Sequence, residues 1–281
     1  MSRAGRAWTG QGDGRERAFL WCEGLPGGIL ASPVLEGRQV STAEVYEWKG
    51  RTGPFAILLR PGVFSPSSTS RILADALEIE GGETVVDVGC GSGVLSIVAA
   101  RLGAARVVGC DISRKAVELA RENAVRLGLV DKTEFREGSL LEPVLDVKAE
   151  VVIGDVSGIP DDLGKVAGWF PDGQAGGPTG AELPSAMLEK IDEVLVPGGR
   201  MYLPTGTIQA ENRILDAARR VFGAANIEQV LEREFPLPDV VARSKEIARL
   251  VGQGLVNLRT RGSRVLWRLS VWRCVRPEEP E

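Results

Sequence analysis

The sequence predicts an α/β protein with a mostly parallel central sheet that carries helices on both faces. From residue 83 onward, short apolar runs typical of strands alternate with segments whose apolar residues recur at helical spacing. This is the pattern of parallel strand–helix–strand units. The last strand, 264–275, follows another strand and a helix in a way that fits an antiparallel pair at one edge of the sheet.

The elements of this region are predicted from local patterns. The segment 113–127, for example, places Ala116, Val117, Ala120 and Ala124 on one face of a helix. The predicted strands are 84–88, 106–110, 133–136, 151–154, 200–203, 227–234 and 264–275. The predicted helices are 95–102, 113–127, about 183–195, 210–221 and 240–251.

The first 60 residues have a different pattern and are predicted to form a separate part of the protein. Residues 1–17 are polar and lack the apolar core of a secretory signal, so we expect a flexible arm. Residues 29–59 read as short alternating strands with turn signals at Glu36-Gly37, Lys49-Gly50 and Thr52-Gly53-Pro54. We therefore expect a small β-rich N-terminal unit within residues 1–60 and a second domain over residues 61–281.

A turn-rich linker at 60–69 connects these two parts. Ser68 or Thr69 is predicted to be the N-cap of the helix that follows. That helix carries Ile72, Leu73, Ala76 and Leu77 on one face.

The composition excludes several kinds of chemistry. The chain contains no histidine, which excludes histidine-dependent hydrolases, a histidine general base and histidine metal sites. The four cysteines show no metal-ligand spacing, so we predict reduced thiols in a cytoplasmic protein and no metal: Cys22, Cys90, Cys110 and Cys274. A net charge of −4 argues against a protein that coats nucleic acid, and no apolar run is long enough to cross a membrane.

Basic residues gather in the C-terminal part of the chain. They either face an acidic or phosphate-bearing partner or form a solvated surface, and the overall acidity favours the solvated surface. These residues are Arg243, Lys245, Arg249, Arg259, Arg261, Arg264, Arg268, Arg273 and Arg276.

A glycine-rich turn follows the predicted strand 84–88. Gly89, Gly91 and Gly93 stand at alternate positions, which lets the backbone approach a ligand closely. The next helix begins there and offers unpaired N–H groups to a carboxylate. Asp111 ends the second strand, where a carboxylate can accept hydrogen bonds from two ribose hydroxyls. The alternative for Asp111 is a role as a helix cap.

Two details distinguish this turn from that of a nicotinamide-dependent oxidoreductase, which is the alternative enzyme class. A dinucleotide fingerprint has a third glycine where this chain has Val94. Asp87 lies just before the turn, where its charge would repel a pyrophosphate. The two details together favour a different nucleotide-type cofactor.

Two segments resemble the first two motifs of class I S-adenosylmethionine-dependent methyltransferases. These segments are Asp87-Val88-Gly89-Cys90-Gly91-Ser92-Gly93 and Val107-Val108-Gly109-Cys110-Asp111. The resemblance covers residues 61–203 and implies a Rossmann-like seven-stranded sheet with a reversed final strand. It also implies that S-adenosyl-L-methionine is the cofactor and that the following residues form its site: Asp87, Gly89, Cys90, Gly91, Gly93, Asp111, Ile112, Ser139 and Leu140.

Flanking segments resemble two groups within that class. Residues 61–66 and 176–183 are similar to the small-domain methyltransferases, which include release-factor glutamine and ribosomal RNA guanine enzymes. Residues 152–160 resemble the matching loop of ribosomal-protein lysine methyltransferases. The Asn-Pro-Pro-Tyr motif of the first group is replaced by Asp155-Val156-Ser157-Gly158, which argues against a planar amide or nucleobase acceptor.

The resemblance implies in-line methyl transfer to a nitrogen or oxygen nucleophile. Asp155 is the predicted catalytic residue, because a carboxylate at the sheet's carboxyl edge can orient the nucleophile and accept its proton. A structural role as a loop or helix cap is the alternative for Asp155. Phe64, Ser65 and Ser157 are predicted to bind the acceptor.

The expected acceptor is a protein side chain or a small molecule. The alternatives are a ribosomal RNA base as acceptor and a non-catalytic, cofactor-binding interaction module. We expect no membrane partner, and the sequence leaves the oligomeric state open.

Overall fold

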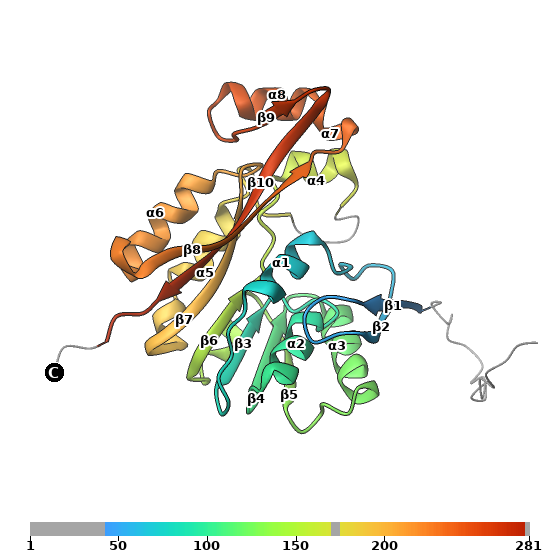
Figure 1. Ribbon diagram of the computed structural model, residues 1–281, viewed down its shortest axis with the longest axis vertical. Helices are drawn as coiled ribbons and strands as arrows, with labels where there is room; N and C mark the ends of the chain where they lie inside the picture. Colours follow the sequence, from blue (N-terminus) through green and yellow to red (C-terminus); the bar gives the residue numbers. More distant parts are fainter. Residues whose placement is uncertain (1–42, 170–174, 279–281) are drawn as a thin grey trace, which may run out of the picture. The chain divides into compact units, whose positions relative to one another are not determined.

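The computed structural model describes residues 43–169 and 175–278. The chain divides into two units, residues 1–40 and residues 41–281. Every helix and strand that the structure describes belongs to the second unit (Figure 1).

One sheet organises the second unit. Its strands follow the order β5-β4-β3-β6-β7-β10-β8, and the short β9 pairs with β10. The pairs from β5 to β7 are parallel, whereas β10 is antiparallel to β7, β8 and β9. The strands are β3 (Thr84–Val88), β4 (Arg106–Asp111), β5 (Thr133–Glu137), β6 (Ala149–Gly154), β7 (Leu195–Gly206), β8 (Ile227–Pro236), β9 (Arg259–Arg261) and β10 (Arg264–Val275). The mostly parallel sheet with a reversed final strand is confirmed.

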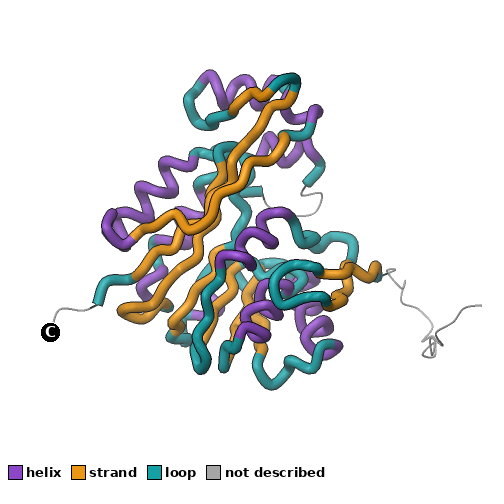
Figure 2. Tube along the Cα trace, in the orientation of Figure 1, coloured by secondary structure: helices purple, strands orange, loops and turns teal. Residues whose placement is uncertain are grey.

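Helices cover both faces of this sheet, as Figure 2 shows in purple beside the orange strands. Alternate residues of each strand face opposite cores, so Val85 packs with α1 and α2 while Val86 packs with α5 and α6. The helices are α1 (Ser68–Ala76), α2 (Val94–Leu102), α3 (Arg114–Arg126), α4 (Asp161–Ala167), α5 (Glu182–Leu188), α6 (Glu211–Phe222), α7 (Asp239–Ala242) and α8 (Lys245–Gly252). Three short 3₁₀ turns are η1 (Glu142–Val144), η2 (Ile191–Glu193) and η3 (Ala224–Asn226).

A small antiparallel hairpin precedes the sheet. Its strands are β1 (Glu44–Trp48) and β2 (Phe55–Leu59), and the Gly53 N–H donates to the Gly50 carbonyl at 3.0 Å within the predicted turn. The Asn123 side chain of α3 bonds both the N–H and the carbonyl of Leu58, which ties the hairpin to the main sheet's helices. The predicted arm over 1–17 and the turn at 36–37 lie outside the described residues, and the boundary at residue 60 stays a prediction.

Three sequence-based predictions are corrected by the structure. The N-cap of α1 is Ser67, whose hydroxyl accepts from the Thr69 N–H at 3.1 Å, rather than Ser68 or Thr69. The helix expected over 183–195 ends at Leu188, because Leu195 pairs with Ala149 and so begins a strand. The helix expected over 240–251 is divided into α7 and α8, because Ser244 caps a new helix by accepting from the Ile247 N–H. In addition, α4 was not predicted.

The C-terminal basic residues are largely engaged with acidic residues of the protein itself. Arg249 pairs with Asp162 at 2.9 Å, and Arg273 pairs with Glu228 at 2.7 Å. Arg243, Arg259 and Arg268 also form ion pairs. This arrangement favours the interpretation of a solvated surface.

Cys90, Cys110 and Cys274 are free and buried, and Cys22 lies outside the described residues. Within residues 43–169 and 175–278, the structure has no helix of sufficient length and apolarity to cross a membrane.

Candidate active site

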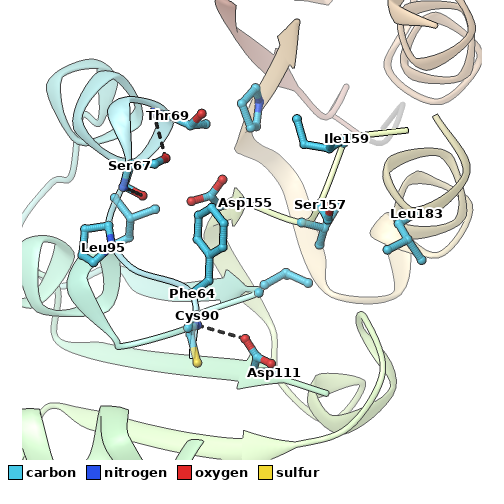
Figure 3. Close-up of a pocket in the computed structure, with 18 of the residues that line it drawn as sticks. Phe64, Ser67, Thr69, Cys90, Leu95, Asp111, Asp155, Ser157, Ile159 and Leu183 are labelled. Carbon is cyan, nitrogen blue, oxygen red and sulfur yellow. Dashed lines mark hydrogen bonds between the residues drawn. The ribbon is translucent and has the colours of Figure 1, made fainter. Parts of the chain in front are cut away.

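A pocket of about 600 Å³ opens at the carboxyl ends of β3, β4 and β6 (Figure 3). It is bounded by the loop before α1, the glycine loop after β3, the end of β4 and the loop after β6. Only two charged side chains, those of Asp111 and Asp155, line it among the residues the structure describes. The pocket therefore has a negative electrostatic character.

The structure brings most of the predicted site residues together in this pocket. Among the residues predicted from the sequence, those that line the pocket are Phe64, Ser65, Gly89, Cys90, Gly91, Asp111, Ile112, Ser139, Leu140, Asp155 and Ser157. Asp87 and Gly93 do not line it. Asp87 is buried within β3, and Gly93 is the N-cap of α2.

Two positions of the glycine loop have no room for a side chain, and this lets the loop contact a neighbouring part of the pocket. Gly89 has a φ of +80°, and a Cβ atom there would lie 2.5 Å from the carbonyl oxygen of Asp155. Gly93 has a φ of +83°, and a Cβ atom would lie 3.0 Å from that of Ala120. Both positions require glycine for backbone conformation and for close approach. As a result, the loop after β3 lies directly against the loop after β6.

Asp111 braces the glycine loop at the end of β4. One carboxylate oxygen accepts from the Gly91 N–H at 2.9 Å, and the other accepts from the Ser113 N–H at 2.8 Å. Burial raises the pKa of Asp111, while these two hydrogen bonds act in the opposite direction. Each oxygen can accept a further hydrogen bond, which leaves room for a hydroxyl-bearing ligand. Helix α3 itself is capped by Ser113.

Asp87 is buried in β3, just before the glycine loop. The Ser96 hydroxyl of α2 donates to one carboxylate oxygen at 2.6 Å, and the other oxygen has no hydrogen-bond partner among the described residues. Burial raises the pKa of Asp87 to about 7, and the nearby Asp155 and Asp111 carboxylates add to this rise. The Asp87 side chain therefore lies next to the pocket without lining it.

Asp155 follows β6 and lies on the opposite side of the Phe64 ring from Asp111 in Figure 3. Burial raises the pKa of Asp155 to about 6, and a hydrogen bond from Ser70 opposes that rise. The side chain is therefore mainly a carboxylate at neutral pH, and it can accept a proton. Two residues further on, the Ser157 hydroxyl is buried and has no hydrogen-bond partner among the described residues.

The glycine-rich segment 175–182 holds the loop after β6 in place. The Gly176 N–H donates to the Ile159 carbonyl at 2.6 Å, and the Asp161 N–H donates to the Gly177 carbonyl at 2.9 Å. The Asp161 carboxylate accepts in return from the Gly177 N–H at 3.0 Å. These bonds fix the backbone that carries Asp155 and Ser157.

Sequence reasoning missed the far wall of the pocket, which includes Ile159, Trp169, Ile208, Gln209 and Trp267. These side chains come from three segments, and the pairing of β10 with β7 brings Trp267 to the other two. The alternation in 264–275 predicted a strand that carries Trp267, but a single strand gives no signal of what its outer end faces.

The segment that carries the glycine loop and Asp111 matches a known family. Residues 69–156 match the family model described as "Ribosomal protein L11 methyltransferase (PrmA)". A ribosomal protein L11 methyltransferase of Clostridium botulinum is 42% identical over 115 residues. This match covers 39% of the present chain and 36% of that relative, so the chain spans little more than a third of the protein it matches.

Solved structures show the same fold over a longer stretch. The tRNA m1G37 methyltransferase of M. jannaschii superposes with a TM-score of 0.55 at 14% identity, covering 86% of this chain and 57% of that one. A putative methyltransferase, SMU.776, solved as a complex with SAH, gives a TM-score of 0.53 at 12% identity and covers 85% and 58%. The chain has the S-adenosylmethionine-dependent methyltransferase fold. The predicted resemblance to class I of these enzymes is confirmed.

Proposed function

We propose that this protein is an S-adenosylmethionine-dependent methyltransferase that methylates a nitrogen atom of a protein side chain. The observation that carries the proposal is the contact between the glycine loop and the backbone of Asp155. In this contact the glycine loop lies against the backbone of the residue whose carboxylate we assign to the acceptor. The match of residues 69–156 to a protein methyltransferase family supports a protein acceptor.

The residues present fit the cofactor. Asp111 keeps a free lone pair on each oxygen, which suits two ribose hydroxyls. The N-terminus of α2 behind Gly89, Cys90 and Gly91 suits the carboxylate of the methionine part. Ile112, Ser139 and Leu140 would border the adenine. When bound, S-adenosylmethionine supplies a methyl group already activated by its sulfonium.

The charge of the pocket favours a nitrogen nucleophile. Among the described residues no lysine or arginine lines it, whereas two carboxylates do, so a carboxylate or phosphate acceptor would be repelled. An amine would be attracted to Asp155, which would orient its lone pair and accept its proton. The nitrogen–methyl bond forms as the sulfur–methyl bond breaks, S-adenosylhomocysteine leaves, and the proton passes through Asp155 to water.

The alternatives are less well supported. The matched segment 69–156 contains the glycine loop, which favours a methyltransferase over a nicotinamide-dependent oxidoreductase. A ribosomal RNA base would bring phosphates to a pocket whose described lining has no cation. A transfer assay separates a non-catalytic module from an enzyme. A cytoplasmic location stays a prediction.

The test combines binding with transfer. Isothermal titration calorimetry should show that the full chain binds S-adenosylmethionine and S-adenosylhomocysteine but not NAD. Transfer is measured with tritiated S-adenosylmethionine. The first acceptor to try is recombinant ribosomal protein L11 of the source organism. The second is a lysate of that organism, separated into protein, RNA and metabolites. Binding of NAD alone would contradict the proposal, and binding without transfer to any fraction would favour a non-catalytic module.

A further inference from the structure

A second, smaller apolar core lies beside the pocket. We call the elements that form it the cap: α4 with the two residues that follow it up to Trp169, α7, α8 and residues 255–267. Figure 1 shows them gathered around the outer end of β10. Their buried residues include Leu163, Val241, Ile247, Leu250 and Val256. The whole cap lies outside the segment 69–156 that matches the methyltransferase family.

The inner side of the cap forms an apolar wall of the pocket. Ile159, Trp169, Ile208 and Trp267 all line the pocket, and all four belong to or pack against the core of the cap. The segment that carries the cofactor loop contains none of them. Thus the glycine loop lies within the matched segment, and this wall lies outside it.

Trp267 is held firmly where the cap meets the sheet. Its ring packs against both the core of the cap and the core beneath α1 and α2. Phe235 lies beside it, with ring centroids 5.5 Å apart. A Cβ atom on Gly206 would come within 3.0 Å of the ring, so glycine at that position makes room for the indole. A side chain packed on three sides presents a fixed surface to whatever enters the pocket.

The pocket combines this wall with a polar corner at Asp155. Asp155 and Ser157 line the same cavity as Trp169 and Trp267, and the Ser157 hydroxyl itself is buried without a hydrogen-bond partner among the described residues. A group that satisfies both environments has a positively charged nitrogen at one end and an apolar stem behind it. Aromatic faces also attract cations.

We propose that the cap is the acceptor-recognition element of this protein. Trp267 and Trp169 form the surface against which the apolar stem of the acceptor amine packs, and so determine which acceptors enter. This inference rests on the proposed function, since it assumes that the amine is directed to Asp155. It assigns acceptor choice to a part of the chain that the matched family segment does not contain.

Fluorine NMR of the full chain tests the proposal without needing catalysis. The six tryptophans are labelled as 5-fluorotryptophan, and each resonance is assigned from single Trp→Phe variants. The protein is saturated with S-adenosylhomocysteine and titrated with n-hexylammonium chloride. The resonances of Trp267 and Trp169 should shift, while those of Trp48 and Trp272, which do not line the pocket, should stay in place. Hexanoate and hexanol are the matched probes without the cation.

Variants then separate recognition from folding. Trp267→Ala should weaken n-hexylammonium binding about tenfold, and Trp267→Phe should weaken it less, because part of the apolar contact remains. Gly206→Ala should also weaken binding by displacing the ring without removing it. Trp48→Phe, in β1 and outside the pocket, is the control and should change nothing. Affinity for S-adenosylhomocysteine should stay within about twofold in all four variants.

Two results would overturn the proposal. One is equal binding of hexanoate and n-hexylammonium, and the other is unchanged n-hexylammonium affinity in both Trp267→Ala and Gly206→Ala. Failure of the unaltered protein to bind S-adenosylhomocysteine would instead contradict the proposed function. The probe titration, repeated without that ligand, would still decide whether the wall of the cap takes an alkylammonium group.

Discussion

The two halves of the pocket are built in different ways. The half formed by the glycine loop and Asp111 comes from two consecutive strand–turn units, and backbone hydrogen bonds from Gly91 and Ser113 hold it. The half that faces the cap comes from three distant segments and is held by side-chain packing around Trp267. A site held by backbone hydrogen bonds needs particular residues at fixed positions, so it can be recognised in the sequence. A site held by side-chain packing can change its lining residues while the fold stays the same.

The most direct way to separate the two halves is to remove the carboxylate that stands between them. Asp155→Asn should lower the transfer rate by about 10²–10⁴, because the amide cannot accept the proton of the acceptor. Affinity for S-adenosylhomocysteine, measured by calorimetry, should change by less than about twofold. Ser157→Ala, which removes a nearby hydroxyl but leaves the carboxylate, is the graded control and should cost about tenfold.

The pH dependence of the transfer rate gives a second test of Asp155. Because the pKa of Asp155 is raised to about 6, transfer by the unaltered protein should fall as the pH is lowered through about 6. The residual activity of Asp155→Asn should lack that step. A step of the same size in both proteins would assign the titration to another group.

Asp111→Ala tests the backbone-defined half. The change removes both the proposed ribose acceptor and the brace on the Gly91 N–H. Affinity for S-adenosylmethionine should fall about 100-fold, since hydrogen bonds to a charged group contribute roughly 1.5–3 kcal/mol each. Asp131→Ala, an exposed position outside the pocket, is the control. Equal affinity in both variants would remove Asp111 from the cofactor site.

Gly89→Ala tests the junction of the two halves. A methyl group there meets the carbonyl of Asp155 in addition to the strain of a positive φ. We expect cofactor affinity and transfer rate both to fall by about tenfold, with a loss of unfolding free energy of about 1–3 kcal/mol. Gly82→Ala is a matched control, because Gly82 has a φ of +99° but no atom within 4 Å of the position that a Cβ would occupy. Equal losses of unfolding free energy in the two variants would show that backbone strain, not the contact with Asp155, causes the loss of stability.

Asp87→Asn is expected to have the smallest effect, and on stability rather than catalysis. Burial raises the pKa of Asp87 in the folded protein to about 7, so its contribution to stability is greatest below about pH 4 and is lost as the pH rises through 7. The uncharged side chain of Asp87→Asn should remove this loss of stability at high pH. The melting temperature should therefore rise by a few degrees at pH 8 and change little at pH 4. Calorimetric scans of the unaltered protein and of Asp87→Asn at the two pH values measure this change in melting temperature. A lower melting temperature at pH 8 would show that the ionised form is needed.

The sequence predicted the parts of the molecule that local patterns determine. Strand 264–275 was predicted with the bounds that β10 has in the structure, because its alternation extends over many residues. The placement of Asp111 and the glycine loop followed from a turn between adjacent elements. The helix break at Ser244 was missed because a capping serine inside an amphipathic stretch looks like an ordinary polar position. The wall formed by Trp169 and Trp267 was missed because it depends on pairing between residues more than 60 positions apart.

The position of β10 between β7 and β8 also has a consequence for the order of assembly during synthesis. Residues up to Asp155 already include β3, β4, β6 and the hydrogen-bond partners of the glycine loop. The wall of the cap cannot form until the chain has passed Val275 and β10 has inserted between two strands made earlier. Non-local antiparallel pairing of this kind is slow. The growing chain therefore contains every strand of the glycine-loop half before it contains the strand that completes the wall of the cap.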